Sequence, residues 1–528
     1  MTSIVLIIEA VFTTTYICFG NMKPIGSITN TLPFIESKYI PDIEALIDKS
    51  INYADFSEKL CEYVLSNDVS DQLAYIALYH ANRVNYYQKQ TEIVTKFSDS
   101  PIFRPLHVID ESSSGIELDW SRILEEVDHA IFCTDNLFIR IDLYVTKWMA
   151  TIATNPSSLD EERIVQRIQD LIDNNTEIKF LQSIIHDIKA DRETRENRYS
   201  DALDSYRLAY EEAIKYDDID FIGEIKIAEA YILARICDPR ALETINHAKR
   251  IWYEMGYLDR RYGWINITAV VHDTRGEYNR ACELYLEGLS NREKIYPDSS
   301  LRLFPQALSR IFRRMDQQNE SIEWAKTGLE SKAAFAYWHT HGRQALANIC
   351  LASSYALQRK IEDASSHLEK ASKLIIESGA ELWLSDMYLC HGFIERAEGN
   401  LLDAMSYFER AYDIVSRMQR QDRINEALFR LAETEILLHA DDIEELFKEN
   451  IKSWNQRLEE MARTKELPGI LGLAYFLKTQ ILMYQNKTEE AKKYFLLVCD
   501  QSKKPETRYL ENYIKKLALY QDVCDTTV

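Results

Sequence analysis

Three arginines near the middle of the chain form the sharpest chemical pattern in the sequence. Arg310, Arg313 and Arg314 stand at positions i, i+3 and i+4, which places their side chains on one face of a helix. Guanidinium groups bind carboxylates through paired hydrogen bonds, so this face could hold an acidic peptide. The alternative is a solvated surface, or ion pairs with Asp and Glu side chains of a neighbouring pair of helices.

Residues suited to catalysis or metal binding are sparse by comparison. His339 and His341 form the most metal-like fragment, followed by Cys390 with His391. A metal site needs three or four converging ligands, and neither fragment has an Asp or Glu at a spacing that would complete one. The sequence also lacks the glycine-rich phosphate loops and the serine and zinc motifs of common enzymes. We therefore expect no catalytic residue, no cofactor, no metal and no enzymatic activity.

The charge balance narrows the class of partner. The chain of 528 residues carries 62 Lys and Arg against 84 Asp and Glu, a net charge of −22. Such a field repels nucleic acid and anionic lipid, so we expect protein partners and no nucleic acid. The nine cysteines are scattered singly with no CxxC pair, which argues against a disulfide framework and fits a reducing, cytoplasmic compartment.

The first 21 residues are the one stretch where a targeting signal could lie. Residues 2–20 contain an apolar run, but Glu9 interrupts it and it is shorter than the roughly 18 apolar residues that a membrane span needs. We interpret residues 1–21 as a disordered leader or a mis-assigned start upstream of Met22. A weak signal or anchor, or packing against the first helix, is the alternative. No membrane span is expected.

The elements that must position these residues are predicted to be helices. Apolar residues return at helical spacing in residues 22–97 and again in 118–183, where we expect degenerate repeats. Between them, residues 98–117 contain two prolines and a Ser-Ser-Ser-Gly run, which predict a loop or linker.

Between residues 184 and 500, small residues recur about every forty positions. The unit is clearest at 388–414, where the Gly399-Asn400 pair predicts a turn between two helices, and Ala404, Phe408 and Ala411 share one face of the second. The residue that opens each second helix is small in seven units: Ala202, Ala241, Ala281, Ser321, Ala364, Ala404 and Ala491. Two further columns, twelve residues before and seven after, are also mostly small. Three such columns indicate stacked helical hairpins, with one degenerate unit near Glu444.

At this pattern, residues 184–500 resemble an array of about eight tetratricopeptide repeats. The stretches 276–289 (GEYNRACELYLEGL) and 399–412 (GNLLDAMSYFERAY) carry the small helix-packing positions. The unit of about 40 residues is similar to the long-unit repeats of MalT and kinesin light chains, although HEAT and armadillo repeats share the period. Each unit would hold two helices of about 17 residues. The resemblance implies an all-α fold, a right-handed superhelical α-solenoid of antiparallel helical hairpins whose first helices line a concave groove.

The resemblance also implies which side chains face that groove. Besides the three arginines, the positions chosen as partner-binding residues are Lys226, Asn266, Phe393 and Arg396. The carboxylate clamp of chaperone-binding repeats needs an Asn one turn after Lys226, where Ala230 stands. Asn266 alone occupies a position of the asparagine ladder found in long-unit relatives, so readout of the partner's side chains is the better expectation.

A capping helix and tail are predicted in residues 501–528. Leu510, Ile514 and Leu517 fall on one side of this helix, and Lys515 and Lys516 on the other. A solenoid's last hairpin would otherwise expose its apolar face, so a helix of this pattern is expected there.

Taken together, these patterns predict a non-enzymatic scaffold or adaptor whose groove binds a peptide or helix of a partner protein. The alternative is a peptide- or ligand-sensing regulator that changes conformation on binding.

Overall fold

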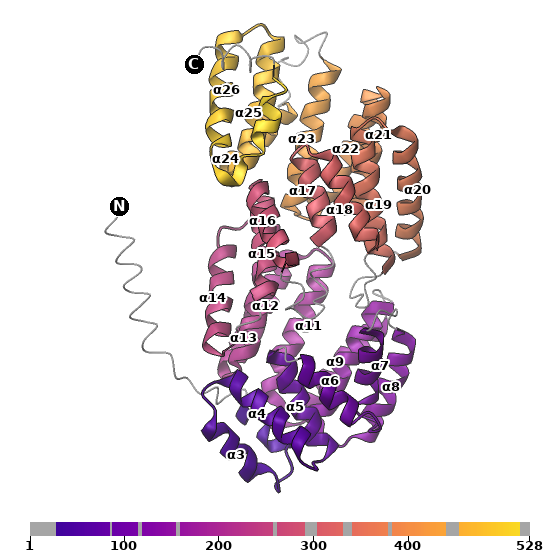
Figure 1. The fold of residues 1–528 in the computed structure, drawn as a ribbon, viewed down its shortest axis with the longest axis vertical. Helices are drawn as coiled ribbons and strands as arrows, with labels where there is room; N and C mark the ends of the chain where they lie inside the picture. Colours follow the sequence, from indigo (N-terminus) through magenta and orange to yellow (C-terminus); the bar gives the residue numbers. More distant parts are fainter. Residues whose placement is uncertain are drawn as a thin grey trace, which may run out of the picture. The chain divides into compact units, whose positions relative to one another are not determined.

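The computed structural model describes residues 28–84, 87–113, 119–154, 159–256, 261–290, 304–330, 340–378, 383–439 and 453–517. Within these ranges every regular element is a helix, which confirms the predicted all-α class (Figure 1). The predicted leader, 1–21, lies outside them. The chain divides into two compact units, and the division falls inside the segment predicted to be one array.

Of the described residues, unit 1 contains those up to Glu229 and those in the segment Glu243–Trp264. Three stacked rings, Phe34, Phe138 and Phe180, form part of its core, with centroids 5.7 Å apart for the first pair and 6.3 Å for the last. Its helices are α3 (Ile40–Lys49), α4 (Tyr53–Ser66), α5 (Asp71–Val84), α6 (Tyr87–Lys96), α7 (Arg104–Ser113), α8 (Trp120–Cys133), α9 (Leu137–Thr154), α10 (Leu159–Asp173), α11 (Gln182–Arg195), α12 (Tyr199–Lys215), most of α13 (Ile219–Arg235) and most of α14 (Ala241–Glu254).

The prediction of a loop at 98–117 is wrong for Arg104–Ser113, because these residues form helix α7. Pro105 is the second residue of this helix. The N–H groups of a first helical turn have no partner within the helix, so a proline there removes no hydrogen bond. The Ser-Gly end of the predicted loop, 114–117, lies outside the described residues.

Unit 2 contains residues 230–242, 265–333 and 337–528. The predicted helix length of about 17 residues holds for α22 and α25, which have 17 each, but α17 and α24 have only 11. Beyond the end of α13 and most of α15 (Arg261–Thr274), its helices are α16 (Tyr278–Ser290), α17 (Phe304–Arg314), α18 (Gln318–Glu330), α19 (Thr340–Leu357), α20 (Ile361–Ser378), α21 (Leu384–Glu398), α22 (Leu401–Arg417), α23 (Gln421–Leu438), α24 (Trp454–Thr464), α25 (Pro468–Tyr484), α26 (Thr488–Ser502) and α27 (Leu510–Ile514).

A left-handed residue follows the first helix in seven of the hairpins that the structure describes. The residues with positive φ at these turns are Asn197, Cys237, Gly276, Asp316, Arg359, Gly399 and Asn486. Each is followed by an N–H that donates to a carbonyl five residues back, as from Gln317 to Phe312 at 2.8 Å and from Asn400 to Glu395 at 2.9 Å. This is a Schellman cap, which satisfies carbonyls that a helix end would leave unpaired. Its return every forty residues or so marks the repeat in the backbone itself.

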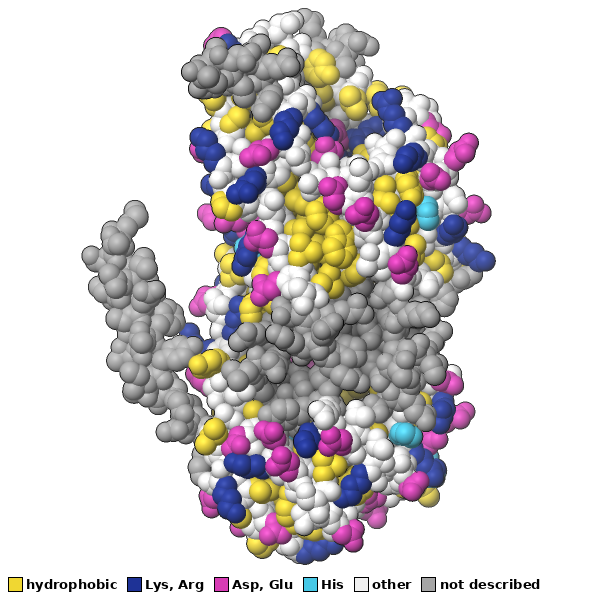
Figure 2. Space-filling view, viewed as in Figure 1, with side chains coloured by type: hydrophobic (Ala, Val, Ile, Leu, Met, Phe, Trp, Pro, Cys, Tyr) yellow, Lys and Arg dark blue, Asp and Glu magenta, His cyan; other side chains and the backbone are white. Residues whose placement is uncertain are grey.

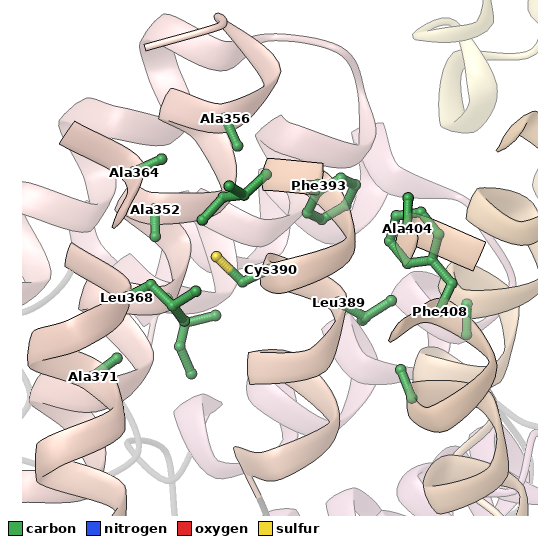
Figure 3. Close-up of a cluster of buried hydrophobic side chains, with 14 of the residues drawn as sticks. Ala352, Ala356, Ala364, Leu368, Ala371, Leu389, Cys390, Phe393, Ala404 and Phe408 are labelled. Carbon is green, nitrogen blue, oxygen red and sulfur yellow. The ribbon is translucent and has the colours of Figure 1, made fainter. Parts of the chain in front are cut away.

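The predicted small-residue column is buried throughout. Ala202, Ala281, Ser321, Ala364, Ala404 and Ala491 have no measurable exposure, and Ala241 is 1% exposed. Figure 3 shows the contact within unit 2, where Ala352 and Ala356 of α19 point toward Ala364 of α20 and the rings of Phe393 and Phe408 meet between α21 and α22. A Cβ added to Gly392 would overlap the Phe408 ring, so a residue without a side chain is required there. The degenerate unit near Glu444 lies outside the described residues.

First and second helices of the hairpins in unit 2 differ in how much of their surface is covered. Ten of the eleven residues of α17 and thirteen of the eighteen of α23 are buried, whereas α22 buries four of seventeen. A helix buried all round lies inside a structure, and one that buries a single stripe lies on its outside. We therefore name the first helices of these hairpins (α17, α19, α21, α23 and α25) the inner helices, and the second helices the outer helices.

Contacts between its first and last hairpins close unit 2. The Gly469 N–H at the start of α25 donates to the Arg275 carbonyl at 3.2 Å, and the rings of Tyr278 and Tyr509 lie 4.8 Å apart. In the C-terminal segment the Tyr513 hydroxyl donates to the Arg314 carbonyl at 2.7 Å. Unit 2 thus turns back on itself around its inner helices.

The predicted capping helix is shorter than expected. Helix α27 has five residues, preceded by a single 3-10 turn at Pro505–Thr507. Leu510, Ile514 and Leu517 are buried as predicted, and Lys515 and Lys516 are exposed. Residues 518–528 lie outside the described ranges. Among the helices that the structure describes, none is long and apolar enough to cross a bilayer.

Candidate functional site

The predicted partner-binding residues fall in both units. Lys226 belongs to unit 1, where its ammonium forms an ion pair with Glu229 at 2.7 Å and lies 4.0 Å from the centre of the Tyr210 ring. Asn266 is half-buried on α15 of unit 2. The other five residues lie on the inner helices α17 and α21, and most of them are joined by contacts.

Phe393 was expected to face an open groove, but the structure buries it to 1% exposure in the core of unit 2. Its ring meets Phe408 edge to face at 5.5 Å. The guanidinium groups of Arg313 and Arg430 lie 5.1 Å and 5.0 Å from the ring centre. The physical reason is that α17 and α23 cover the face of α21 that carries Phe393, so cations and an aromatic ring share one interior.

Arg313 and Arg314 are also buried, at 4% and 3% exposure, and their partners are carboxylates of neighbouring helices. Glu426 of α23 accepts from Arg313 Nη1 through one oxygen and from Arg314 Nε at 2.9 Å through the other. Arg314 Nη1 donates to Asp273 at 2.6 Å, and its Nη2 donates to the Asp422 carbonyl at 3.1 Å. These contacts match the ion pairs that the sequence left open as the alternative. Partner binding by these two residues stays a prediction.

Arg310 and Arg396 differ in their partners. Arg396, at the surface end of α21, forms an ion pair with Glu433, which also pairs with Arg430 at 3.0 Å. Arg310 is 8% exposed, and the described residues offer its guanidinium no hydrogen bond and no ion pair. The three arginines of the sequence pattern therefore have different surroundings, although they share one helix.

Charged residues that the sequence did not single out complete this region. Asp422 is shared by Arg420 at 3.1 Å, Arg235 at 3.0 Å and Arg423 at 3.5 Å. Arg423 also approaches Asp386 of α21 at 2.5 Å. We name ten buried charged residues, carried by α15, α17, α21 and α23 and by the N-cap of α23, the inner charge cluster: Asp273, Arg310, Arg313, Arg314, Asp386, Arg420, Asp422, Arg423, Glu426 and Arg430.

Nearby arginines dominate the titration of Asp422 in the cluster and of Glu433 beside it. Burial raises the pKa of the Asp422 carboxyl, but the charges of Arg420, Arg235 and Arg423 outweigh burial and hold that pKa well below its usual value. Burial likewise raises the pKa of Glu433, yet Arg396 and Arg430 bring it down to about 2. These carboxylates are therefore charged at neutral pH.

A sequence signal for the missed residues exists. Asp422, Glu426 and Arg430 stand four residues apart, so they form one charged line along α23. Such a line normally marks a solvent-facing stripe. Only the covering of α23 by other inner helices makes it interior, and that covering depends on the closure of unit 2.

The surface itself shows no comparable concentration of arginine on the face in Figure 2, where basic and acidic side chains are interspersed over the described residues. In the part of the chain that the structure describes, no three His, Cys, Asp or Glu side chains are arranged to hold a metal ion. Residue 339 and the side chain of His341 lie outside that part. Cys390 is buried, which raises the pKa of its thiol to about 12, and His391 stacks on Tyr407 at 4.9 Å.

Fold and site together define a helical repeat protein with a charged interior in its second unit. No family model matches the sequence, and no curated protein matches it. Among solved structures, it is similar to a Rap protein in complex with competence and sporulation factor. The two sequences are 15% identical, the TM-score is 0.45, and the similarity covers 74% of this chain and 98% of that chain. A likeness at this level carries no argument about ligand or activity.

Proposed function

We propose that this protein is a non-enzymatic scaffold or adaptor of the tetratricopeptide type, which binds a peptide or helix of a partner protein along its inner helices. The observation that carries the proposal is the hairpin repeated about every forty residues, with a Schellman turn at each step. Stacked hairpins create an extended surface from consecutive first helices, and such surfaces bind segments of other chains. The unit length favours the long-unit subtype.

The chemistry of the inner helices favours a partner with acidic residues. Helix α17 contributes three arginines, and Arg396 extends the basic character to α21. Carboxylates of this chain already occupy Arg313 and Arg314, which indicates that the region accommodates paired guanidinium and carboxylate groups. The net charge of −22 disfavours nucleic acid. A reducing, cytoplasmic setting is part of the same proposal.

A second candidate, a peptide- or ligand-sensing regulator, is supported by a specific feature of unit 2. The ion pairs between Arg313, Arg314 and Glu426 join residues that are more than a hundred positions apart in the sequence. A ligand carboxylate that exchanged with Glu426 would separate α17 from α23 and so open unit 2. Binding would then be coupled to a change of conformation.

Site-specific photo-crosslinking tests the proposed function. A photo-reactive amino acid replaces Lys226 on α13 or Arg396 on α21, and the protein is expressed in its native host. Matched controls carry the same group at Arg207 of α12 and Glu409 of α22, which are exposed on second helices. We expect the partner to crosslink at Arg396 of the inner helix α21, or at Lys226 of unit 1, and not at the control on a second helix of the same unit. Equal crosslinking at all four positions would reject the inner helices as the binding surface.

A further inference from the structure

The inner charge cluster of unit 2 holds more positive than negative charge. Its ten residues are each at least nine-tenths buried, and they comprise six arginines and four carboxylates. Within this set of described residues, guanidinium groups outnumber carboxylates by two. Buried charges are normally paired, because an ion without a counter-ion in a protein interior is strongly destabilising.

The pairing contacts locate one uncompensated charge at Arg310, whereas Arg423 has Asp386 beside it. Arg313 and Arg314 share Glu426, Arg314 also has Asp273, and Arg430 has Glu433. Arg310 has no such partner among the described residues, and its Nε is buried without an acceptor.

Arg423 is only partly compensated. Its Nη1 lies 2.5 Å from Asp386 but without the direction of a hydrogen bond, so that N–H lacks an acceptor. Its Nε has only the distant and shared carboxylate of Asp422.

The two guanidinium groups act on each other as like charges. Burial, and then the nearby charge of Arg310, lower the pKa of Arg423 to about 9. That value still leaves Arg423 protonated at neutral pH, so Arg423 keeps its positive charge. The 8% of Arg310 that stays exposed leaves this side chain in contact with solvent.

We propose that Arg310 and Arg423 together bind one oxyanion group supplied from outside the chain. A carboxylate or a phosphate fits, because two guanidinium groups can donate to both oxygens of such a group in planar, charge-assisted hydrogen bonds. If the proposed function holds, this group is a carboxylate of an acidic residue in the bound peptide; this identification rests on the proposed function. Arg313 and Arg314 then have a structural part, as ion-pair partners of Glu426 and Asp273.

Thermal unfolding of the full chain in inorganic phosphate, compared with chloride at equal ionic strength, tests the anion site. Phosphate also stabilises folded proteins in general. The rise in Tm that it gives each protein is therefore compared with the rise in the control variant Arg280→Met, which changes an exposed arginine of α16. We expect Arg310→Met to abolish the extra rise in Tm that phosphate gives the wild type. In chloride the same variant should melt higher than the wild type, because it removes an uncompensated buried charge. Arg313→Met should melt lower, since it leaves Glu426 with one partner fewer.

The site is overturned if Arg310→Met melts lower in chloride, or if it keeps the full response to phosphate. A separate arm uses synthetic hexaglutamate and hexaglutamine peptides and measures binding directly. We expect hexaglutamate to bind and Arg310→Met to weaken it about tenfold or more. A phosphate response without hexaglutamate binding would keep the anion site and count against the acidic peptide of the proposed function. Absence of both responses in the wild type would reject the anion site, while crosslinking at the inner helices could still succeed.

Discussion

Acidic residues between arginines make the interior of unit 2 sensitive to acid. Glu433 illustrates the sign: its pKa is about 2 in the folded protein against an ordinary value of 4.5. A carboxyl with a lowered pKa contributes stability that is complete above its unfolded pKa and is lost as the pH falls through the folded one. We therefore expect the free energy of unfolding of the wild type to fall as the pH drops from about 4.5 toward 2.

Urea unfolding at a series of pH values measures this loss, with Glu433→Gln as the control. The variant cannot titrate at this position, so its stability should depend less steeply on pH across the same window. Identical slopes for the two proteins would show that Arg396 and Arg430 do not hold the Glu433 carboxyl in the way that their contacts indicate.

For individual residues, the sequence predicted the arginines of the site and missed its carboxylates. The spacing of Arg310, Arg313 and Arg314 is local, so it is visible in the chain. Their partners, Asp273 and Glu426, come from other helices, and Glu426 is more than a hundred residues away. Burial of all these groups depends on long-range packing that no local pattern encodes, which is why Phe393 was expected on a surface.

The two helices of a hairpin pack through the small residues that the forty-residue repeat in the sequence identified. Ala404 of α22 has no exposed surface and lies in the cluster that contains Phe393 of α21 and Phe408 of α22. Replacement by leucine adds volume where neighbours cannot withdraw, so we expect Ala404→Leu to destabilise by about 1–3 kcal/mol. Thermal unfolding measures the change. Glu409→Gln, on the exposed side of the same helix, should change stability by less than about 0.5 kcal/mol; equal Tm values for the two would contradict the register.

The turns between helices were less accessible from sequence than the helices. Of the seven left-handed turn residues, only Gly276 and Gly399 are glycines, and the rest include Arg359 and Cys237, which carry no turn signal. Closely packed helices on both sides fix the chain there and offset the strain. The same reasoning explains α7, because a proline in a first turn resembles a loop signal until the helix that follows it is seen.

Closure of unit 2 is the feature of the whole molecule on which the candidate site depends. It covers the inner helices, places carboxylates against the arginines of α17, and brings Tyr509 and Tyr513 against residues some two hundred positions earlier. The period predicts a stack of hairpins, but it does not predict how tightly the stack turns. The burial of the inner charge cluster in unit 2 follows from that closure.

A single glycine tests whether this closed form exists in solution. Gly469, the second residue of α25, lies against the backbone of Gly276, and a Cβ at position 469 would overlap the Gly276 carbonyl. An alanine in a helix normally stabilises by about 0.5–1 kcal/mol relative to glycine. Here we expect Gly469→Ala to lower Tm instead, because neither backbone can withdraw without opening the unit. Amide hydrogen exchange should speed up in α15, α16 and α25 and stay unchanged in unit 1. A raised Tm would mean that the two glycines are not in contact. The inner charge cluster would then be open to solvent, and a partner could reach it without any change of conformation.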